Sequence, residues 1–358
     1  MSGWHFRALV PNVRLQEAIG SHAIAMVPYG DERLRKMSDT DDRLRKLLEG
    51  FSDQFGRKRH PSAIISARTS APLPGADLID FRNVIALSCL VGGAQHTVLS
   101  QSPVSSVIPI VCCDYFDLYP MYLPGNGHEA LLSSSYGGIG MDTDIRKFRG
   151  QTSPALHNVD AAVPIPDRFV LDTLMNEWTA LYVDGRPAES RVLRVFRSLQ
   201  VAYHAAAMPA KNGASLHDFG IAVSQWVSSM EVLLHPDKNK VDQVHVLKSL
   251  AKHRWIDPEL TKQHWSLPGS GSRAEIPLNL VQHLCHQLYR TRHDFVHGND
   301  LSNTPYHSPL ENMQGPGWLL VAPLAFRAAL SCCFDRYDPG GEFENALLAV
   351  LRDSSYSP

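Results

Sequence analysis

The chain has 358 residues, 44% of them hydrophobic and 20% charged, which is typical of a globular protein with well-filled cores and excludes a disordered chain. Its length exceeds one typical domain and predicts two. The formal net charge is −2, so a polyanion would have to be bound by a local basic patch, which argues against a general nucleic-acid coat protein.

Neither a membrane span nor a disulfide framework is expected. The longest apolar runs, such as residues 84–93, are far shorter than the roughly 20 residues that a membrane helix needs, and residues 1–7 lack the pattern of a signal peptide. We therefore expect a cytoplasmic protein with no membrane partner. The six cysteines form no C-x-x-C motif, which argues against a cysteine zinc site. The neighbouring pairs at 112–113 and 332–333 are expected to be small buried hydrophobic residues.

Residues 1–160 predict a mixed α/β domain. Short apolar runs alternate there with Gly, Pro and Ser, which is typical of strands and short buried segments. These runs occupy residues 23–27, 63–65, 107–111 and 130–132. The mixed-charge segments 31–36 and 41–46 fall in one stretch of helical periodicity that reaches Phe55, with acidic residues ahead of basic ones as on a solvated helix. A further helix, packed inward, is predicted over 78–87.

Two local patterns in this part suggest nucleic-acid or phosphate binding but have simpler explanations. The basic run Arg57-Lys58-Arg59-His60 is too short to indicate a nucleic-acid surface. The segment Gly137-Gly138-Ile139-Gly140 lacks the Lys-Ser/Thr pair that follows the glycines of a phosphate-binding loop, so a tight turn is predicted there.

Residues 161–358 predict an all-α bundle. Apolar residues recur at helical spacing through this part, with a polar connection over 257–277. The predicted helices cover residues 167–183, 191–208, 216–234, 241–253, 278–297, 318–337 and 343–351. The expected fold class is therefore α+β, an N-terminal mixed α/β domain followed by an all-α helical bundle.

The helix predicted over 278–297 ends in an unusual cationic string, Tyr289-Arg290-Thr291-Arg292-His293-Asp294-Phe295-Val296-His297-Gly298. At about 100° per residue, one polar stripe contains His283, His286, Arg290, His293 and His297, and the opposite side contains Val281, Leu284, Leu288 and Phe295. Gly298 is placed to end the helix in the left-handed conformation. A helix end with guanidinium and imidazole groups is suited to a phosphate, and His297 is the candidate general acid or base.

The spacing alone does not establish a site. The chain contains 17 histidines, so an arginine followed five to seven positions later by a histidine also arises without a function. Arg197 and His204 form such a pair, and no function is predicted for them.

The string Tyr289-Arg290-x-Arg292-His293-x-x-Val296-His297-Gly298 resembles the signature of the HEPN superfamily of metal-independent ribonucleases. That signature is an arginine, a polar residue, three variable residues and a histidine, which Arg292, His293 and His297 match in register. The end of the preceding helix, with Glu231, looks like the family's acidic position. The resemblance covers roughly residues 165–351, and the flanking Tyr-Arg and His-Gly are most similar to the Apea-like group of prokaryotic defence proteins.

The resemblance implies that residues 161–358 are a HEPN-like endoribonuclease domain, a hydrolase that uses no metal or other cofactor. The 2′-hydroxyl of the RNA would attack the neighbouring phosphate, leaving a 2′,3′-cyclic phosphate and a 5′-hydroxyl. In this scheme His297 transfers the proton, Arg292 stabilises charge on the phosphorane and His293 orients the phosphate. The expected substrate-binding residues are Arg290, Asp294 and Glu231, and Glu231 is expected to hold Arg290 or Arg292.

The resemblance also implies partners and a setting. RNA is the expected substrate, and a homodimer through the helical domain would bring two such helices to one cleft. A role in antiviral defence, as a toxin or in growth arrest is implied, with residues 1–160 as a possible sensor or regulatory domain.

The position of the arginine leaves two explanations open. On an ideal helix Arg292 lies about 140° from His297, whereas Arg290, seven residues before His297, points the same way. Either the last turn unwinds near Gly298, or Arg292 faces a partner subunit. We expect Arg292 to be the catalytic arginine and Arg290 to contact the phosphate.

Two other functions fit parts of the pattern. A non-catalytic HEPN-like module for nucleotide or RNA binding, or for dimerisation, needs the same helix without the chemistry. A metal site of His283, His286, His293 and His297 has spacings that bring imidazoles to one ion, but Asp294 and Cys285, the other ligand types nearby, point elsewhere on the helix.

Overall fold

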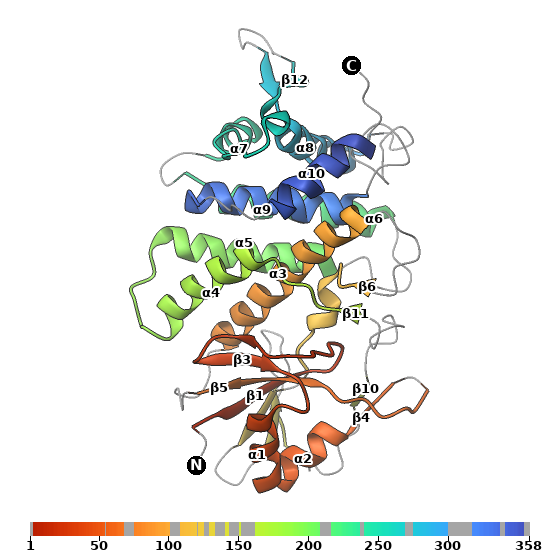
Figure 1. The fold of residues 1–358 in the computed structure, drawn as a ribbon, viewed down its shortest axis with the longest axis vertical. Coiled ribbons are helices and arrows are strands. Elements are labelled where there is room, and N and C mark those ends of the chain that lie inside the picture. Colours follow the sequence, from red (N-terminus) through yellow and green to blue (C-terminus); the bar gives the residue numbers. More distant parts are fainter. Residues whose placement is uncertain are drawn as a thin grey trace.

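The computed structural model describes residues 3–53, 55–67, 75–100, 108–119, 121–124, 129–132, 140–142, 150–151, 162–207, 216–236, 240–268, 275–299, 317–336 and 341–353. A small antiparallel sheet lies at the N-terminal end, and α-helices form most of the rest, so the class is α+β (Figure 1). None of the helices in these ranges is long and apolar enough to cross a membrane.

The N-terminal sheet has four antiparallel strands in the spatial order β1-β5-β3-β2. Their bounds are His5–Val10 for β1, Ile19–Gly20 for β2, Ile24–Val27 for β3 and Ser62–Ser66 for β5. Side chains alternate between two cores, as strand geometry requires. Leu9 and Ile65 face α1 (Glu32–Thr40) and α2 (Asp42–Glu49), whereas Ala8 and Ile64 face the core that contains α3 (Gly75–Ser100).

The predicted mixed-charge helix is two helices, because Asp41 interrupts it. The Asp41 carboxylate accepts hydrogen bonds from the amides of Arg43 and Leu44, so it caps the start of α2. The expected continuation to Phe55 is wrong: α2 ends at Glu49, and β4 (Phe51–Ser52) pairs with β10 (Gly150–Gln151).

Two arginines of the basic run after β4 share one carboxylate. Arg57 and Arg59 contact the Asp53 carboxylate at 3.1 and 3.0 Å. Asp53 therefore organises this loop, while Arg57 and Lys58 stay exposed.

Further short elements connect the sheet to the helices. They are β6 (Ile108–Pro109), the 3-10 helix η1 (Cys113–Phe116), β7 (Met121–Pro124), β8 (Glu129–Leu132), β9 (Gly140–Asp142) and β11 (Ala162–Val163). The predicted strands at 107–111 and 130–132 correspond to β6 and β8. The turn predicted at 137–140 lies outside the described residues except for Gly140, which begins β9.

Helix α3 is predicted as an inward-packed helix, and it is buried along most of its length. It runs from the sheet into the helical layer, where it packs against α4 (Arg168–Tyr182), α5 (Ser190–Ala207), α9 (Trp318–Phe334) and α10 (Glu342–Asp353) (Figure 1). One hydrophobic core therefore continues from the sheet through α3 to the C-terminal helices. The boundary predicted at residue 160 separates α3 in sequence from helices that it contacts in space.

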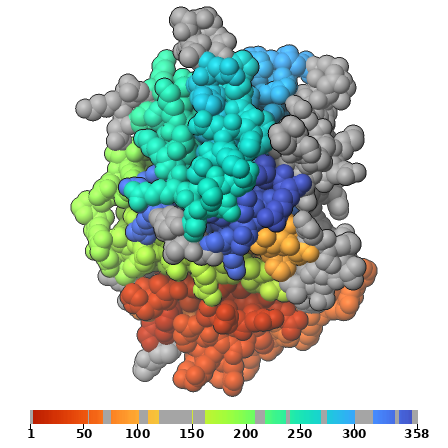
Figure 2. Space-filling view, turned by 45° about the horizontal axis from the view of Figure 1, so that its top comes forward, coloured from red at the N-terminus to blue at the C-terminus, as the bar shows by residue number. Residues whose placement is uncertain are grey.

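The remaining helices are α6 (Leu216–Leu233), α7 (Gln243–Leu250) and α8 (Leu280–His297). Helix α6 packs along α5, and α8 packs on α6, α7 and α9. Figure 2 shows the N-terminal layer at one end of the molecule and the surface of residues around 240–297 toward the other. The end of α8 thus belongs to the helical end, away from the sheet.

The C-terminal part was expected to be all-α, but it also contains two strands. The segment 257–277, predicted as a polar connection, contains the 3-10 helix η4 (Pro258–Thr261) and an antiparallel hairpin of β12 (Trp265–Leu267) and β13 (Ile276–Leu278). The hairpin forms because its apolar residues alternate and Trp265 packs against α8. Strand β13 then leads directly into α8.

Candidate functional site

Both ends of α8 are fixed by local hydrogen bonds. At the start, Asn279 and Gln282 exchange side-chain to backbone hydrogen bonds of 3.0 Å in a capping box. At the end, Gly298 has a φ of 68°, which confirms the predicted left-handed residue. The amide of Asn299 donates to the carbonyl of Asp294 at 3.0 Å. The helix therefore stays regular to His297, so of the two explanations left open for the position of Arg292, unwinding of the last turn is wrong.

The first half of the predicted polar stripe is covered by protein. The His283 ring is 5% exposed and stacks on Trp265 of β12, with centroids 4.5 Å apart and an interplanar angle of 14°. Burial, with smaller contributions from His286 and Arg290, lowers the pKa of His283 to about 4. The Nδ1 of His286 lies 2.6 Å from the Nε2 of Gln243 in α7, and burial lowers the pKa of His286. The His283 ring is therefore part of the interior, and the His286 ring is half-buried against α7.

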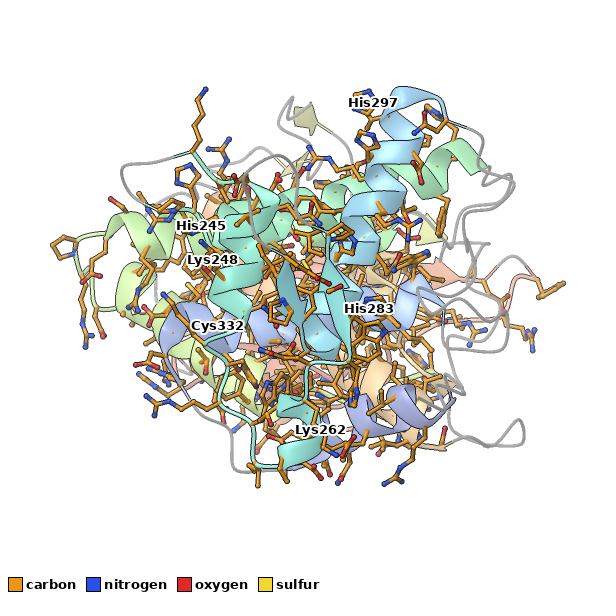
Figure 3. All side chains as sticks on the ribbon, turned by 90° about the horizontal axis from the view of Figure 1, so that it is seen from above. His245, Lys248, Lys262, His283, His297 and Cys332 are labelled. Carbon is orange, nitrogen blue, oxygen red and sulfur yellow. The ribbon has the colours of Figure 1, made fainter. Side chains whose placement is uncertain are left out.

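The second half of the stripe faces solvent. Arg290, His293 and His297 are exposed, and the rings of His293 and His297 lie with centroids 4.3 Å apart. Figure 3 shows His297 at the outer end of α8, far along the helix from His283. The neighbouring Val296 is 59% exposed. Two imidazoles, a guanidinium and an apolar side chain thus share one open helix end.

Arg292 faces α6 and is fixed there. Its Nη1 lies 3.1 and 3.2 Å from the two carboxylate oxygens of Glu231, and the hydroxyl of Tyr289 donates to the same carboxylate at 3.0 Å. Burial raises the pKa of Tyr289, and the Glu231 charge raises it further, so the phenol keeps its proton. Of the two arginines that Glu231 was expected to hold, it contacts Arg292.

The other predicted substrate-binding residues occupy different positions. Arg290 is exposed and makes a long hydrogen bond of 3.5 Å to Gln287. Asp294 accepts from the side chain of Asn299 at 3.0 Å and so belongs to the structure that ends α8. Arg290 is therefore accessible to a phosphate, whereas Asp294 is engaged at the end of the helix.

The structure adds contacts that were not predicted from the sequence. One is the hydrogen bond from Tyr289 to Glu231. Tyr289 was singled out only as part of the motif, although its spacing of three residues from Arg292 places both on the same helix face. Another is the close approach of Gly220 of α6 to Phe295, because a Cβ at Gly220 would lie 2.1 Å from the Phe295 ring. The ring of His217 also approaches Phe295, at 5.5 Å between centroids. A glycine inside a helical pattern was the available signal for this close contact.

The four-histidine metal site is not assembled. His283 is buried against Trp265, whereas His293 and His297 are exposed at the far end of the helix. Within the described ranges, no three His, Cys, Asp or Glu side chains converge in a way that would hold a metal ion.

The site is defined by its own geometry. The Glu231 carboxylate of α6 fixes the Arg292 guanidinium of α8, and α8 also carries the exposed imidazoles of His293 and His297. Such groups can bind a phosphate and transfer a proton. No protein-family model, curated protein or solved structure matches the chain.

Proposed function

We propose that the helical part of the chain is a HEPN-like, metal-independent endoribonuclease whose catalytic residues are Arg292, His293 and His297. The observation that carries the proposal is the exposed His293–His297 pair on the same helix end as an arginine that Glu231 fixes. An ordered guanidinium and two solvent-facing imidazoles are the groups needed for charge stabilisation and proton transfer at a phosphodiester.

The proposed reaction is internal transesterification. The 2′-oxygen of the RNA forms a bond to phosphorus while the bond from phosphorus to the 5′-oxygen breaks. His297 carries out one of the two proton transfers, from the 2′-hydroxyl or to the leaving 5′-oxygen, and water carries out the other. Arg292 neutralises the charge on the phosphorane oxygens. His293 orients the phosphate, and Arg290 contacts the adjoining backbone.

Two copies of the chain fit this chemistry better than one. Arg292 is directed toward Glu231 on α6, and on a helix that stays regular it lies about 140° from His297. A second copy docked at the helix end would place its own α8 beside the first. The exposed Val296 gives that contact an apolar element. The arginine of one copy and the histidine of the other would then flank one phosphate.

The biological setting is proposed on the family resemblance. A free ribonuclease needs restraint, and the N-terminal sheet and its helices are suited to provide it because they share a continuous core with the helical part. We propose a defence or growth-arrest role in the cytoplasm, with RNA as the substrate.

The test is cleavage of a mixed RNA pool in EDTA, with end-group analysis of the products. His297→Ala is expected to lower the rate about 100- to 10,000-fold, and Arg292→Ala about 100-fold or more. Arg197→Ala and His204→Ala are the matched controls, since both residues are exposed on α5. Products ending in 2′,3′-cyclic phosphates that disappear only with the α8 variants would support the proposal. Cleavage that needs a divalent metal, or that survives in His297→Ala, would refute it.

One observation favours a non-catalytic alternative. The Arg292 guanidinium already has a carboxylate partner within the chain, so it could act only in packing α8 on α6. The helical part would then be a non-catalytic module that binds RNA or nucleotides, or that only mediates dimerisation. RNA binding by a dimeric wild type without cleavage, weakened by Arg290→Ala, would support this alternative.

A further inference from the structure

A second cluster of basic side chains lines a cavity between the segment after α7 and the end of α9. The cavity has a volume of about 310 Å³ and is lined by Lys252 and Arg254 from one segment and by Ser331, Asp335 and Arg336 from the other. Figure 3 shows Cys332, which also lines it, at the end of α9 and away from His297. None of these residues belongs to the candidate site on α8.

The charge of the cavity is opposite to that of the chain. Lys252, Arg254 and Arg336 supply three positive charges and Asp335 one negative charge, which gives a local balance of +2 in a chain of net charge −2. His253 adds none near neutral pH, because burial lowers its pKa to about 4. An anion is therefore attracted to this place and not to the surface in general.

These cations are only weakly used by the protein itself. Lys252 has no ion pair within the described ranges, Arg254 contacts Asp335 at 3.5 Å with both side chains largely exposed, and Arg336 reaches a hydroxyl at 3.5 Å. The end of α9 does not require them either. The amides of Asp335 and Arg336 already donate to the last carbonyls of the helix.

A residue that lines the cavity carries a buried hydroxyl without a partner among the described residues, which points to the same kind of ligand. Ser331 is 3% exposed, and its Oγ has no hydrogen-bond partner in the described part of the chain. A buried polar atom without a partner is costly, and native proteins rarely keep one without a reason. Beside it, Asp335 has a φ of 46°, a conformation that non-glycine residues seldom adopt.

We propose that this cavity binds a small phosphate-bearing molecule, held by Lys252, Arg254 and Arg336, with Ser331 as a hydroxyl donor. The volume suits a phosphate with a nucleoside-sized group attached. Arginine and lysine together provide a planar fork and a point charge for phosphate oxygens. The proposal is independent of the ribonuclease activity proposed for α8.

Calorimetric titration of the full-length chain at low ionic strength, with inorganic phosphate, adenosine 5′-monophosphate and adenosine as separate ligands, tests the proposal. Binding of both phosphates but not of adenosine is expected. Equal affinities would identify free phosphate as sufficient, and an affinity at least about tenfold higher for the monophosphate would identify a nucleotide. No binding of either phosphate, or equal binding of adenosine, would overturn the proposal.

Variants separate this site from general charge attraction. Lys252→Gln and Arg336→Gln are each expected to weaken phosphate binding about tenfold, the size of one lost hydrogen bond to a charged group. Asp335→Asn keeps a residue that tolerates the left-handed conformation and removes the negative charge, so it should tighten binding about two- to fivefold. Lys262→Gln is the control and should leave binding unchanged. Like the other three substituted positions, Lys262 is exposed.

Ser331→Ala tests the buried hydroxyl. Without ligand, the variant should be as stable as the wild type, because it removes an unpaired polar atom, whereas phosphate binding should weaken about two- to tenfold. Unchanged binding in Lys252→Gln and Arg336→Gln, or an equal loss in Lys262→Gln, would overturn the proposed site.

Discussion

The two halves of α8 carry similar polar side chains but have different surroundings. In the first half, His283 stacks on Trp265 and His286 contacts Gln243, so the hairpin and α7 cover both rings. In the second half, the rings of His293 and His297 lie against each other and are exposed, with no other hydrogen bond, ion pair or ring contact from the part of the chain that the structure describes. Residue type and helical spacing are the same in both halves. The elements that pack on the helix therefore decide which histidines are accessible for chemistry.

The inner face of α8 changes character at the same point. Leu284 and Leu288 of the first half are fully buried. In the second half, Phe295 packs half-buried against Gly220, and Arg292 contacts Glu231. In the described part of the chain, the end of the helix is thus held to α6 by the Phe295 ring and by the hydrogen bonds of Tyr289 and Arg292 to Glu231.

The largest expected effect that separates the two halves is on stability. His283→Ala should lower the free energy of unfolding by about 2–4 kcal/mol, because it leaves a cavity against Trp265. His297→Ala should change it by no more than about 0.5 kcal/mol, as expected for an exposed side chain. Urea unfolding of both variants at neutral pH measures the difference. Equal losses of unfolding free energy would show that His283 contributes no more to stability than the exposed His297.

The pH dependence of stability sharpens the same comparison. The pKa of His283 is lowered from 6.5 to about 4 in the folded chain, so between these values the unfolded chain binds a proton that the folded chain does not. Stability from this group is complete above pH 6.5 and is lost as the pH falls toward 4. The loss is about 2 kcal/mol near pH 5.

His283→Phe isolates that contribution. It keeps an aromatic ring against Trp265 but cannot titrate, whereas His253, which titrates in the same direction, is unchanged. The variant should therefore lose less stability than the wild type between pH 8 and pH 5 in urea unfolding. The same loss in both proteins would mean that the buried imidazole is protonated as readily as in the unfolded chain.

The contrast also explains which parts of the fold were predictable. The helices α4, α5, α6 and α8 repeat apolar residues at helical spacing and could be placed within a few residues. Strand β1 was missed because it is buried on both faces and lacks alternation, and it even contains the buried Arg7, paired with Asp77 at 2.8 Å. The hairpin β12–β13 was missed because its strands have three residues each and are separated by a polar, glycine-rich segment.

The candidate site was predictable to a similar extent. The left-handed Gly298 follows from helix physics, whereas the motif residues and a contact between Glu231 and an arginine were expected from the family resemblance. The burial of His283 does not, because Trp265 comes from a separate element whose position depends on tertiary packing. The assignment of catalytic roles to Arg292, His293 and His297 stays a prediction.

A smaller effect is expected where α8 meets α6. Gly220→Ala places a Cβ against the Phe295 ring, which overpacking penalises by about 1–3 kcal/mol. The helix propensity of alanine offsets about 1 kcal/mol of this. A net loss of about 1 kcal/mol, seen in thermal unfolding, is therefore expected. Ser228→Ala, half-buried and two turns farther along the same helix, is the control. A stabilised Gly220→Ala protein would show that the ring moves aside freely.

The smallest expected change in stability comes from Glu231→Gln. Both side chains of the Glu231–Arg292 pair are partly exposed, at 20% and 33%, so losing the charge should cost about 1 kcal/mol or less. Glutamine still accepts the Tyr289 hydrogen bond but no longer fixes the guanidinium electrostatically. If Arg292 acts in RNA cleavage, the rate should fall well beyond the change in stability. A double-mutant cycle with Arg292→Ala measures how far the two residues act together. An unchanged rate in Glu231→Gln, alongside an inactive Arg292→Ala, would mean that Arg292 works without being held and that the contact between α6 and α8 serves packing alone.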